Sequence, residues 1–233
     1  MPMGFVGRMA ARTAIARVAD ELAERLADQT EVAIETAVRL RARSLAEGVE
    51  VERLLYPDLA DDLFLVHLVR RRAKLSGLIG AITAVPSTFP GAGTAVALGS
   101  SLADSAAMLY SEVALIVELC AASGRPVDDP DVLTVDVLVV LASSAGVEVP
   151  EDLLLEARRG TLEPSAIPHS TLADLNRELG ARVVKRIARR RARIILGREL
   201  PFGFGVALGG AANYRTMRAL GWTATKHLLS LKP

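Results

Sequence analysis

The segment from Leu75 to Ala103 is the longest stretch of the chain without a charged residue, and its middle reads Val85-Pro86-Ser87-Thr88-Phe89-Pro90-Gly91. A stretch of this length is nominally long enough to span a bilayer as one helix. Two prolines and a glycine interrupt the helical hydrogen-bond ladder, however, so a continuous helix is excluded. We predict two short apolar helices joined by a turn. Each is too short to cross a membrane, so together they form either a buried core pair or a re-entrant hairpin at the membrane interface.

Helical patterns also dominate the rest of the chain, and strand signals are nearly absent. We expect helices to begin at Tyr56-Pro57-Asp58, Asp129-Pro130-Asp131 and Val149-Pro150, because proline is favoured in the first helical turn. The first of these is expected to end in the basic cluster at residues 70–74. The predicted fold is an all-α, multi-helix bundle with two Gly/Pro-broken apolar helical hairpins. A long helix capped by Ser170-Thr171 and a final helix from about Phe204 to Leu231 complete it.

Two regions are expected, an N-terminal amphipathic helical region over residues 1–56 and a helical domain over residues 57–233. The chain has 233 residues, of which 51% are apolar, 24% charged and only 4% aromatic, with a formal net charge of +1. This composition excludes a disordered chain and favours close helix packing by small aliphatic side chains. The single cysteine, Cys120, cannot form an internal disulfide and is expected to be a small buried apolar residue.

A short sequence occurs twice, as Val96-Ala97-Leu98-Gly99 and as Val206-Ala207-Leu208-Gly209. The match is an internal duplication or a chance identity, and the sequence does not decide between them. In both copies small residues are spaced four apart, which lets two helix backbones approach closely. We therefore expect Gly99, Gly205 and Gly209 to pack helices together, including the two copies against each other.

A basic cluster precedes each apolar segment, which suits an anionic membrane surface. Solvated faces of ordinary surface helices are the alternative. Nucleic acid is a disfavoured partner, because interleaved aromatic residues and a known reader motif are lacking. The residues assigned to a membrane or partner surface are Arg70, Arg71, Arg72, Lys74, Val85, Phe89, Arg182, Lys185, Arg189, Arg193, Phe202 and Phe204.

Four polar residues, Ser100, Asp104, Ser111 and Glu118, lie on one face of the helix predicted after Pro90. We favour a face exposed to water. If the face is covered, its carboxylates need partners, and Arg215 and Arg218 are the expected ones. Asp104 and Asn213 are the candidate buried polar residues.

Motifs that carry catalytic chemistry are missing from the sequence. The three histidines are far apart and belong to neither a zinc-protease nor a di-iron motif. His67 lies in an apolar run and is interpreted as a core residue with its hydrogen bonds satisfied. We therefore expect a protein that is not an enzyme, with no catalytic, cofactor or metal site.

The C-terminal block reads Leu200-Pro201-Phe202-Gly203-Phe204-Gly205, then Gly209-Gly210-Ala211-Ala212-Asn213-Tyr214, and then reaches Gly221. This block resembles the closing motif of the EcsC family. The hairpin from Gly77 to Tyr110, followed by Asp129-Pro130-Asp131, is similar to the central region of that family. The resemblance covers about Lys74 to Leu231. It implies a helical, membrane-associated bacterial protein without assigned catalytic residues.

Two functions follow as expectations. One is a non-enzymatic accessory or scaffold protein that is cytoplasmic and lies peripherally on the anionic inner face of the cell membrane. The other is a soluble helical protein–protein interaction module, whose apolar hairpins form its core or a homo-oligomer interface.

Overall fold

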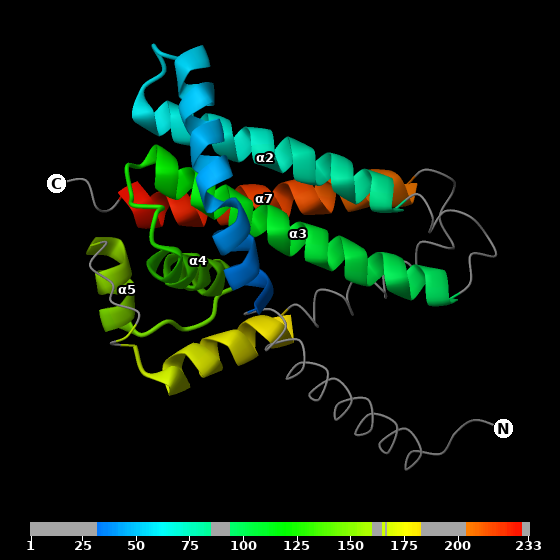
Figure 1. Cartoon of the computed structure of the whole chain (residues 1–233). Coiled ribbons are helices and arrows are strands. Elements are labelled where there is room, and N and C mark those ends of the chain that lie inside the picture. The colour runs from blue at the N-terminus through cyan, green and yellow to red at the C-terminus, as the bar shows by residue number, and fades with distance from the viewer. Residues whose placement is uncertain (1–31, 85–93, 160–164, 166, 183–203, 230–233) are drawn as a thin grey trace.

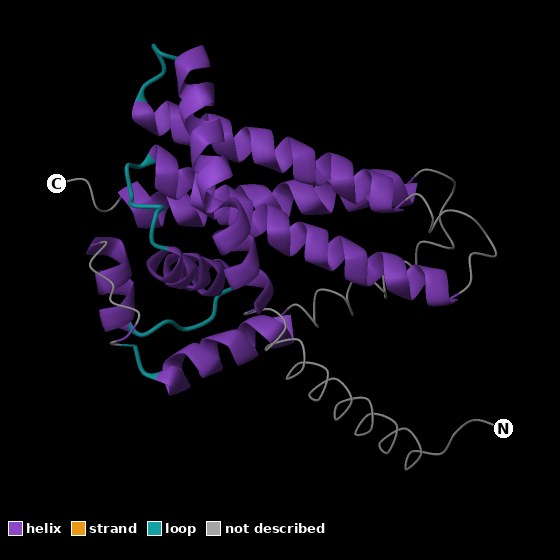
Figure 2. Ribbon diagram, in the orientation of Figure 1, coloured by secondary structure: helices purple, strands orange, loops and turns teal. Residues whose placement is uncertain are grey.

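Every regular element in the described part of the chain is a helix (Figure 2). The computed structural model describes residues 32–84, 94–159, 165, 167–182 and 204–229. The prediction of an all-α bundle is confirmed. The helices span residues 32–55, α2 (Asp61–Ala84), α3 (Thr94–Ala122), α4 (Pro130–Ser144), α5 (Glu151–Arg159), residues 169–182 and α7 (Phe204–Leu229).

Three long helices, α2, α3 and α7, pack against one another and project from the same side of the molecule (Figure 1). We call this projection the arm. The end of α2 and the beginnings of α3 and α7 lie at its outer end. Helix 32–55 crosses over α3 where the arm meets the body of the molecule.

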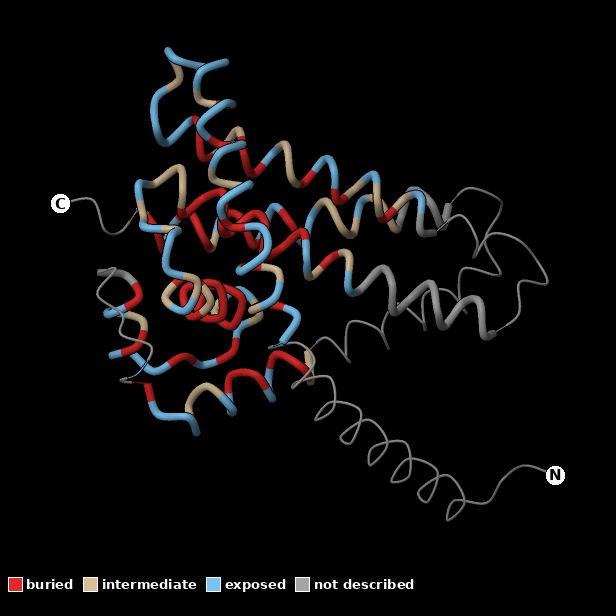
Figure 3. The backbone as a smooth tube through the Cα atoms, in the orientation of Figure 1, coloured by how far each residue is buried: buried red, intermediate tan, exposed pale blue. Residues whose placement is uncertain are grey.

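The body of the molecule is built around α4, whose residues from Val135 to Ala142 are all buried (Figure 3). One apolar cluster joins α4 to helix 32–55, α2, α3 and α7 through side chains such as Ile34, Leu68 and Leu115. A second cluster joins the other side of α4 to α5 and helix 169–182. Helix 32–55 therefore shares its core with the rest of the protein.

The predicted start of α4 is confirmed in detail. The Asp129 carboxylate accepts hydrogen bonds from the backbone N–H groups of Asp131 (3.0 Å) and Val132 (3.2 Å), and Pro130 follows it in the first turn. This is the arrangement that satisfies the free N–H groups at a helix start. Beyond the last turn Gly146 has a positive φ of 68°, a backbone conformation that favours glycine. The helices predicted after Val149-Pro150 and from Phe204 are also present.

The expected end of α2 at residues 70–74 is wrong. The helix continues through the basic cluster to Ala84, because Arg71 and Arg72 find acidic partners on neighbouring helices and do not have to be left in water. Its start is also later than expected. Pro57 lies in a turn, and α2 begins at Asp61 with two carboxylates in its first turn, where the helix dipole favours them.

Helices lie on either side of Pro86 and Pro90 as predicted, but α2 has 24 residues and α3 has 29, so the prediction that they are short is wrong. No described helix has both the length and the apolarity needed to cross a membrane. The turn itself, at residues 85–93, lies outside the described residues, as does the expected continuation of helix 169–182 to Leu196.

Glycines bring α2 and α7 into close antiparallel contact. A Cβ added to Gly77 would lie 3.3 Å from the Gly210 carbonyl oxygen, and one added to Gly210 would lie 3.0 Å from that of Gly77. Further along, a Cβ on Gly80 would lie 2.8 Å from the Gly209 carbonyl oxygen. Gly209 therefore packs helices as expected, but its helix packs mainly on α2 and less on α3, the helix that carries the other copy of the repeat. The reason is that α2 has its own glycines opposite those of α7.

Candidate functional site

The described helix segments at the outer end of the arm carry no charged residue. We define the arm end as residues 75–84 of α2, 94–103 of α3 and 204–214 of α7, which contain no Asp, Glu, Lys or Arg. The glycine contacts place the α2 and α7 segments side by side. At a rise of 1.5 Å per residue, each uncharged segment is about 15 Å long.

Large aliphatic side chains of α2 are exposed along this end. Leu75, Leu78 and Ile82 are 47%, 58% and 61% exposed, and their spacing of three and four residues places them on one helical face. Several aliphatic side chains left in water on one helix face commonly mark an interaction site.

Exposed cations border the arm end on the side of the body. Lys74 immediately precedes the uncharged segment of α2, and Arg215 immediately follows that of α7. Arg218 lies one turn further along, with its guanidinium 5.8 Å from the centre of the Tyr214 ring. We call these three residues the collar. Cations therefore border the arm end on α2 and α7, whereas Asp104 follows the uncharged segment of α3.

The assignment of the whole first basic cluster to a surface needs correction. Arg70 and Lys74 are exposed, but Arg71 and Arg72 turn toward the core. The physical reason is the helical period, because the three consecutive positions 70 to 72 cannot all face the same side of a helix. Arg182 is also partly buried, and its Nη2 donates a hydrogen bond of 2.8 Å to the Gly146 carbonyl oxygen.

A network of partly buried ion pairs holds Arg71 and Arg72. Glu118 of α3 accepts from Nη2 of Arg71 (2.6 Å) and from Nε of Arg72 (2.8 Å), and its side chain is only 4% exposed. Arg71 also pairs with Glu52 of helix 32–55, and Glu52 Oε1 lies 2.8 Å from His67 Nε2. The network therefore ties together three helices. His67 has its hydrogen-bond partner, as expected of a core residue, although its side chain is 30% exposed.

The predicted water-facing stripe on α3 is wrong for the part that the structure describes. Ser111 and Glu118 are both buried. The acid is paired with Arg71 and Arg72 and not with the expected Arg215 and Arg218, which are both exposed on α7. The alternative of a covered face was correct, but the partner helix was wrong because α2 crosses α3 at this point.

A second buried ion pair joins the end of α3 to α4. Nη1 of Arg125 lies 2.7 Å from Oδ2 of Asp136, and both side chains are at most 10% exposed. Burial raises the pKa of Asp136, while Arg125 opposes that shift. Nearby, burial raises the pKa of the Cys120 thiol to about 12, with a further contribution from Asp136. Such a thiol is a packing residue and a poor nucleophile, as its apolar neighbours predicted.

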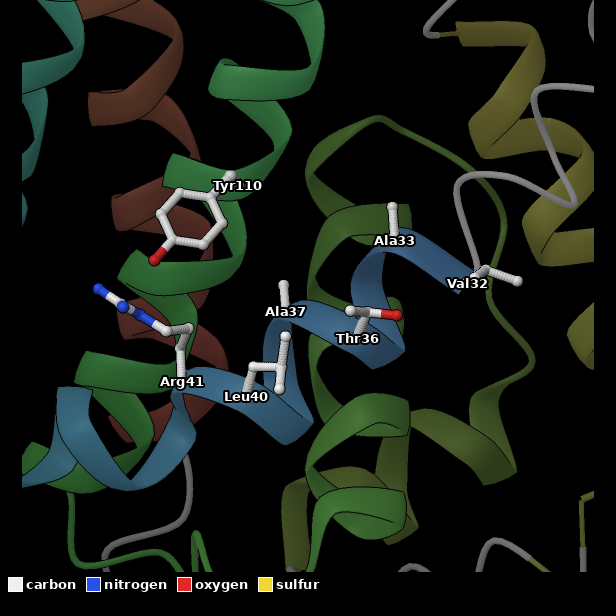
Figure 4. Close-up of a pocket in the computed structure, with 7 residues that line it drawn as sticks. All are labelled: Val32, Ala33, Thr36, Ala37, Leu40, Arg41 and Tyr110. Atoms are coloured by element: carbon white, nitrogen blue, oxygen red, sulfur yellow. The ribbon is translucent and has the colours of Figure 1, made fainter.

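An open apolar groove lies between helix 32–55 and α3 (Figure 4). Its volume is about 770 Å³. Arg41 and the hydroxyl of Tyr110 are its ionisable groups, and a guanidinium has no lone pair with which to act as a base. The described residues that line the groove are Val32, Ala33, Thr36, Ala37, Leu40, Arg41 and Tyr110.

The described residues contain no cluster of His, Cys, Asp and Glu that could hold a metal ion. Asn213 is partly buried, with its side chain against Gly80. Four more predicted residues lie in helices, but the structure does not describe their burial or contacts: Gly99, Asp104, Phe204 and Gly205. Val85, Phe89, Lys185, Arg189, Arg193 and Phe202 lie outside the described residues altogether.

Comparison with known proteins gives no relative: no family model, no curated protein and no solved structure matches this chain. The resemblance to the EcsC family therefore stays a prediction.

Proposed function

We propose that the chain is a non-enzymatic accessory or scaffold protein that binds the surface of an anionic membrane through its arm end. The observation that carries the proposal is the uncharged outer part of three adjacent helices, with Leu75, Leu78 and Ile82 exposed on it. The hydrocarbon core of a bilayer is about 30 Å thick, so an uncharged arm end of about 15 Å reaches to the middle and does not cross. The resemblance to the EcsC family points the same way.

The collar supports the anionic character of the membrane. With the arm end in the hydrocarbon, Lys74, Arg215 and Arg218 lie at the level of the lipid headgroups. Each cation near an anionic surface contributes about 1 kcal/mol. The arm end would insert into the hydrocarbon, and the collar would make the protein prefer anionic lipid.

Vesicle co-sedimentation tests the proposal. We expect the protein to sediment with phosphatidylcholine vesicles that contain phosphatidylglycerol, and to do so less as salt rises, because salt screens the collar. The Leu78→Asp/Ile82→Asp variant should remain in the supernatant. The matched control is Leu54→Asp/Leu55→Asp, which places the same charges on exposed leucines at the other end of α2 and should sediment like the parent.

Substitutions in the collar separate the electrostatic contribution to membrane binding from the contribution of the apolar arm end. Lys74→Gln with Arg215→Gln should weaken binding to anionic vesicles by about 2 kcal/mol, roughly 30-fold. Binding to neutral vesicles should change little. If the parent protein stays in the supernatant and forms a dimer that Leu78→Asp/Ile82→Asp disrupts, the arm end is a homo-oligomer interface and the membrane proposal is wrong.

A further inference from the structure

A second apolar surface lies at the opposite end of α2 from the arm end. We call it the cap, formed by Val51, Leu54, Leu55, Tyr56 and Leu63 at the turn between helix 32–55 and α2. Leu54 and Leu55 are 79% and 71% exposed, the first of them more than any other large apolar side chain described. The 24 residues of α2 place the cap about 36 Å from the outer end of that helix. Figure 3 shows that most residues of this turn are exposed.

The cap is held in place by specific contacts. Nη1 of Arg53 donates a hydrogen bond of 2.8 Å to the Leu59 carbonyl oxygen, and the same guanidinium lies 4.7 Å from the centre of the Phe64 ring and pairs with Asp61. The Tyr56 ring packs against His67, with 4.6 Å between their centroids. The exposed leucines are therefore displayed by an anchored turn, so that little ordering is needed when a partner binds.

The charge around the cap is negative. Glu50, Asp58 and Asp62 are exposed, and none forms an ion pair with another described residue. Arg53 is the one cation among residues 50–63, and it is occupied by Asp61. An anionic membrane would repel such a surface, and two caps brought together would repel each other. The complementary surface is apolar with a basic border.

We infer that the cap is a docking surface for a basic amphipathic helix of a protein partner. Its exposed aliphatic side chains would receive the apolar face of that helix, and Glu50, Asp58 and Asp62 would pair with basic residues along its edges. The inference is independent of the proposed membrane function, because the cap and the arm end share no residue. If both are correct, the protein holds its partner at a fixed distance from the membrane.

A peptide-binding experiment tests the inference on the full chain. The probe is a fluorescent peptide of about 18 residues, five helical turns, with leucine on one face and lysine on the other. Its counterpart has glutamate in place of each lysine. By fluorescence anisotropy we expect saturable binding of the basic peptide, and at least about tenfold weaker binding of the acidic one.

Variants locate the binding. Leu54→Ser/Leu55→Ser should weaken binding of the basic peptide at least about tenfold, as loss of two central apolar contacts does in helix recognition. Glu50→Gln/Asp58→Asn/Asp62→Asn should weaken it and reduce its salt dependence. The matched control is Leu78→Ser/Ile82→Ser, which removes exposed aliphatic side chains from the arm end and should leave peptide binding unchanged. Circular dichroism checks that each variant is folded.

Several outcomes overturn the inference. They are an absence of saturable binding, equal binding of the two peptides, and equal binding by the parent and Leu54→Ser/Leu55→Ser. A dimer in sedimentation velocity that the same variant abolishes would assign the cap to a second copy of this chain. Loss of vesicle binding by that variant would assign it to lipid. Failure of the vesicle experiment alone leaves the peptide result intact, so the two proposals fail separately.

Discussion

Glu118 is the central residue of the ion-pair network that joins helix 32–55, α2 and α3. Its carboxylate meets two guanidiniums from α2, and its side chain is almost fully buried. Burying the Glu118 carboxylate and most of the Arg72 side chain is costly, and the attraction between these charges offsets that cost only while both are present. Removing one partner therefore lowers the free energy of unfolding by more than the whole network contributes to it.

The Glu118→Gln variant should be strongly destabilised. Glutamine keeps the shape but leaves Arg72 without a carboxylate and Arg71 with Glu52 alone, so we expect a loss of about 3–5 kcal/mol in the free energy of unfolding. Urea unfolding followed by circular dichroism measures it. The control is Glu35→Gln, which removes an exposed ion pair with Arg39 one helical turn away and should cost at most about 0.5 kcal/mol. Equal stability of Glu118→Gln and the parent would mean that the network does not form in solution.

The thiol of Cys120 should not react with thiol reagents in the folded protein. With a pKa of about 12, roughly 10⁻⁴ of the thiol is ionised at pH 8, and the side chain is fully buried. We expect a thiol reagent to label the protein in urea, with a rate that follows the unfolded fraction, and not in buffer. Rapid labelling in buffer at pH 8 would show that this part of α3 opens without global unfolding.

The same thiol makes stability depend on alkaline pH. In the unfolded chain its pKa is about 8.5, so between about pH 8.5 and 12 the unfolded state loses a proton that the folded state keeps. The free energy of unfolding therefore falls as pH rises through that window. In Cys120→Ala this contribution is removed, and the decline between pH 8.5 and 10 should be less steep than in the parent. Parallel slopes in urea titrations of the two proteins would contradict the raised pKa.

At the scale of the elements, the close contact of α2 and α7 depends on glycines. A Cβ on Gly80 would lie 2.5 Å from Nδ2 of Asn213 and 2.8 Å from a backbone carbonyl oxygen, which cannot move without shifting α7. We expect Gly80→Ala to destabilise the protein by about 1–3 kcal/mol in spite of the better helix propensity of alanine. Gly48 is the matched control, because it is helical with nothing within 4 Å of an added Cβ, and Gly48→Ala should stabilise by up to about 1 kcal/mol. Thermal unfolding of both variants decides whether the two changes have opposite signs.

The elements also show which features the sequence could predict. The start of α4 was predictable, because the Asp129 side chain accepts hydrogen bonds from backbone N–H groups only two and three residues further along the chain. The course of α2 through Arg71 and Arg72 was not, because their partner Glu118 is 46 and 47 residues away and is brought to them only by the crossing of α2 and α3. The arm end was partly predictable. The uncharged segment and the prolines that interrupt it can be read from the sequence, but the way in which α2 is aligned with α7 cannot.

At the scale of the whole molecule, α2 connects two surfaces of opposite character. The arm end is uncharged and is bordered by cations on α2 and α7, whereas the cap is apolar and bordered by carboxylates. An anionic membrane would attract the first surface and repel the second, so under the proposed function the charges would orient the molecule as well as attach it. Bound in this way, the protein would stand with α2 steeply inclined to the membrane and the cap facing away from it.

Tryptophan fluorescence can test that orientation directly. Trp222, the only tryptophan, lies on α7 about 10 Å beyond Arg215 on the side of the body, so it should not be quenched by lipids brominated on their acyl chains. In a Trp222→Phe background, Leu78→Trp places the indole about 6 Å below the collar, and vesicles should shift its emission to the blue and allow acyl-chain bromine to quench it. Leu54→Trp in the same background places the indole in the cap, where aqueous iodide should quench it equally with and without vesicles. If bromine quenches the indole at position 54 as strongly as that at position 78, the protein lies flat on the membrane, and the arm end is not its point of entry.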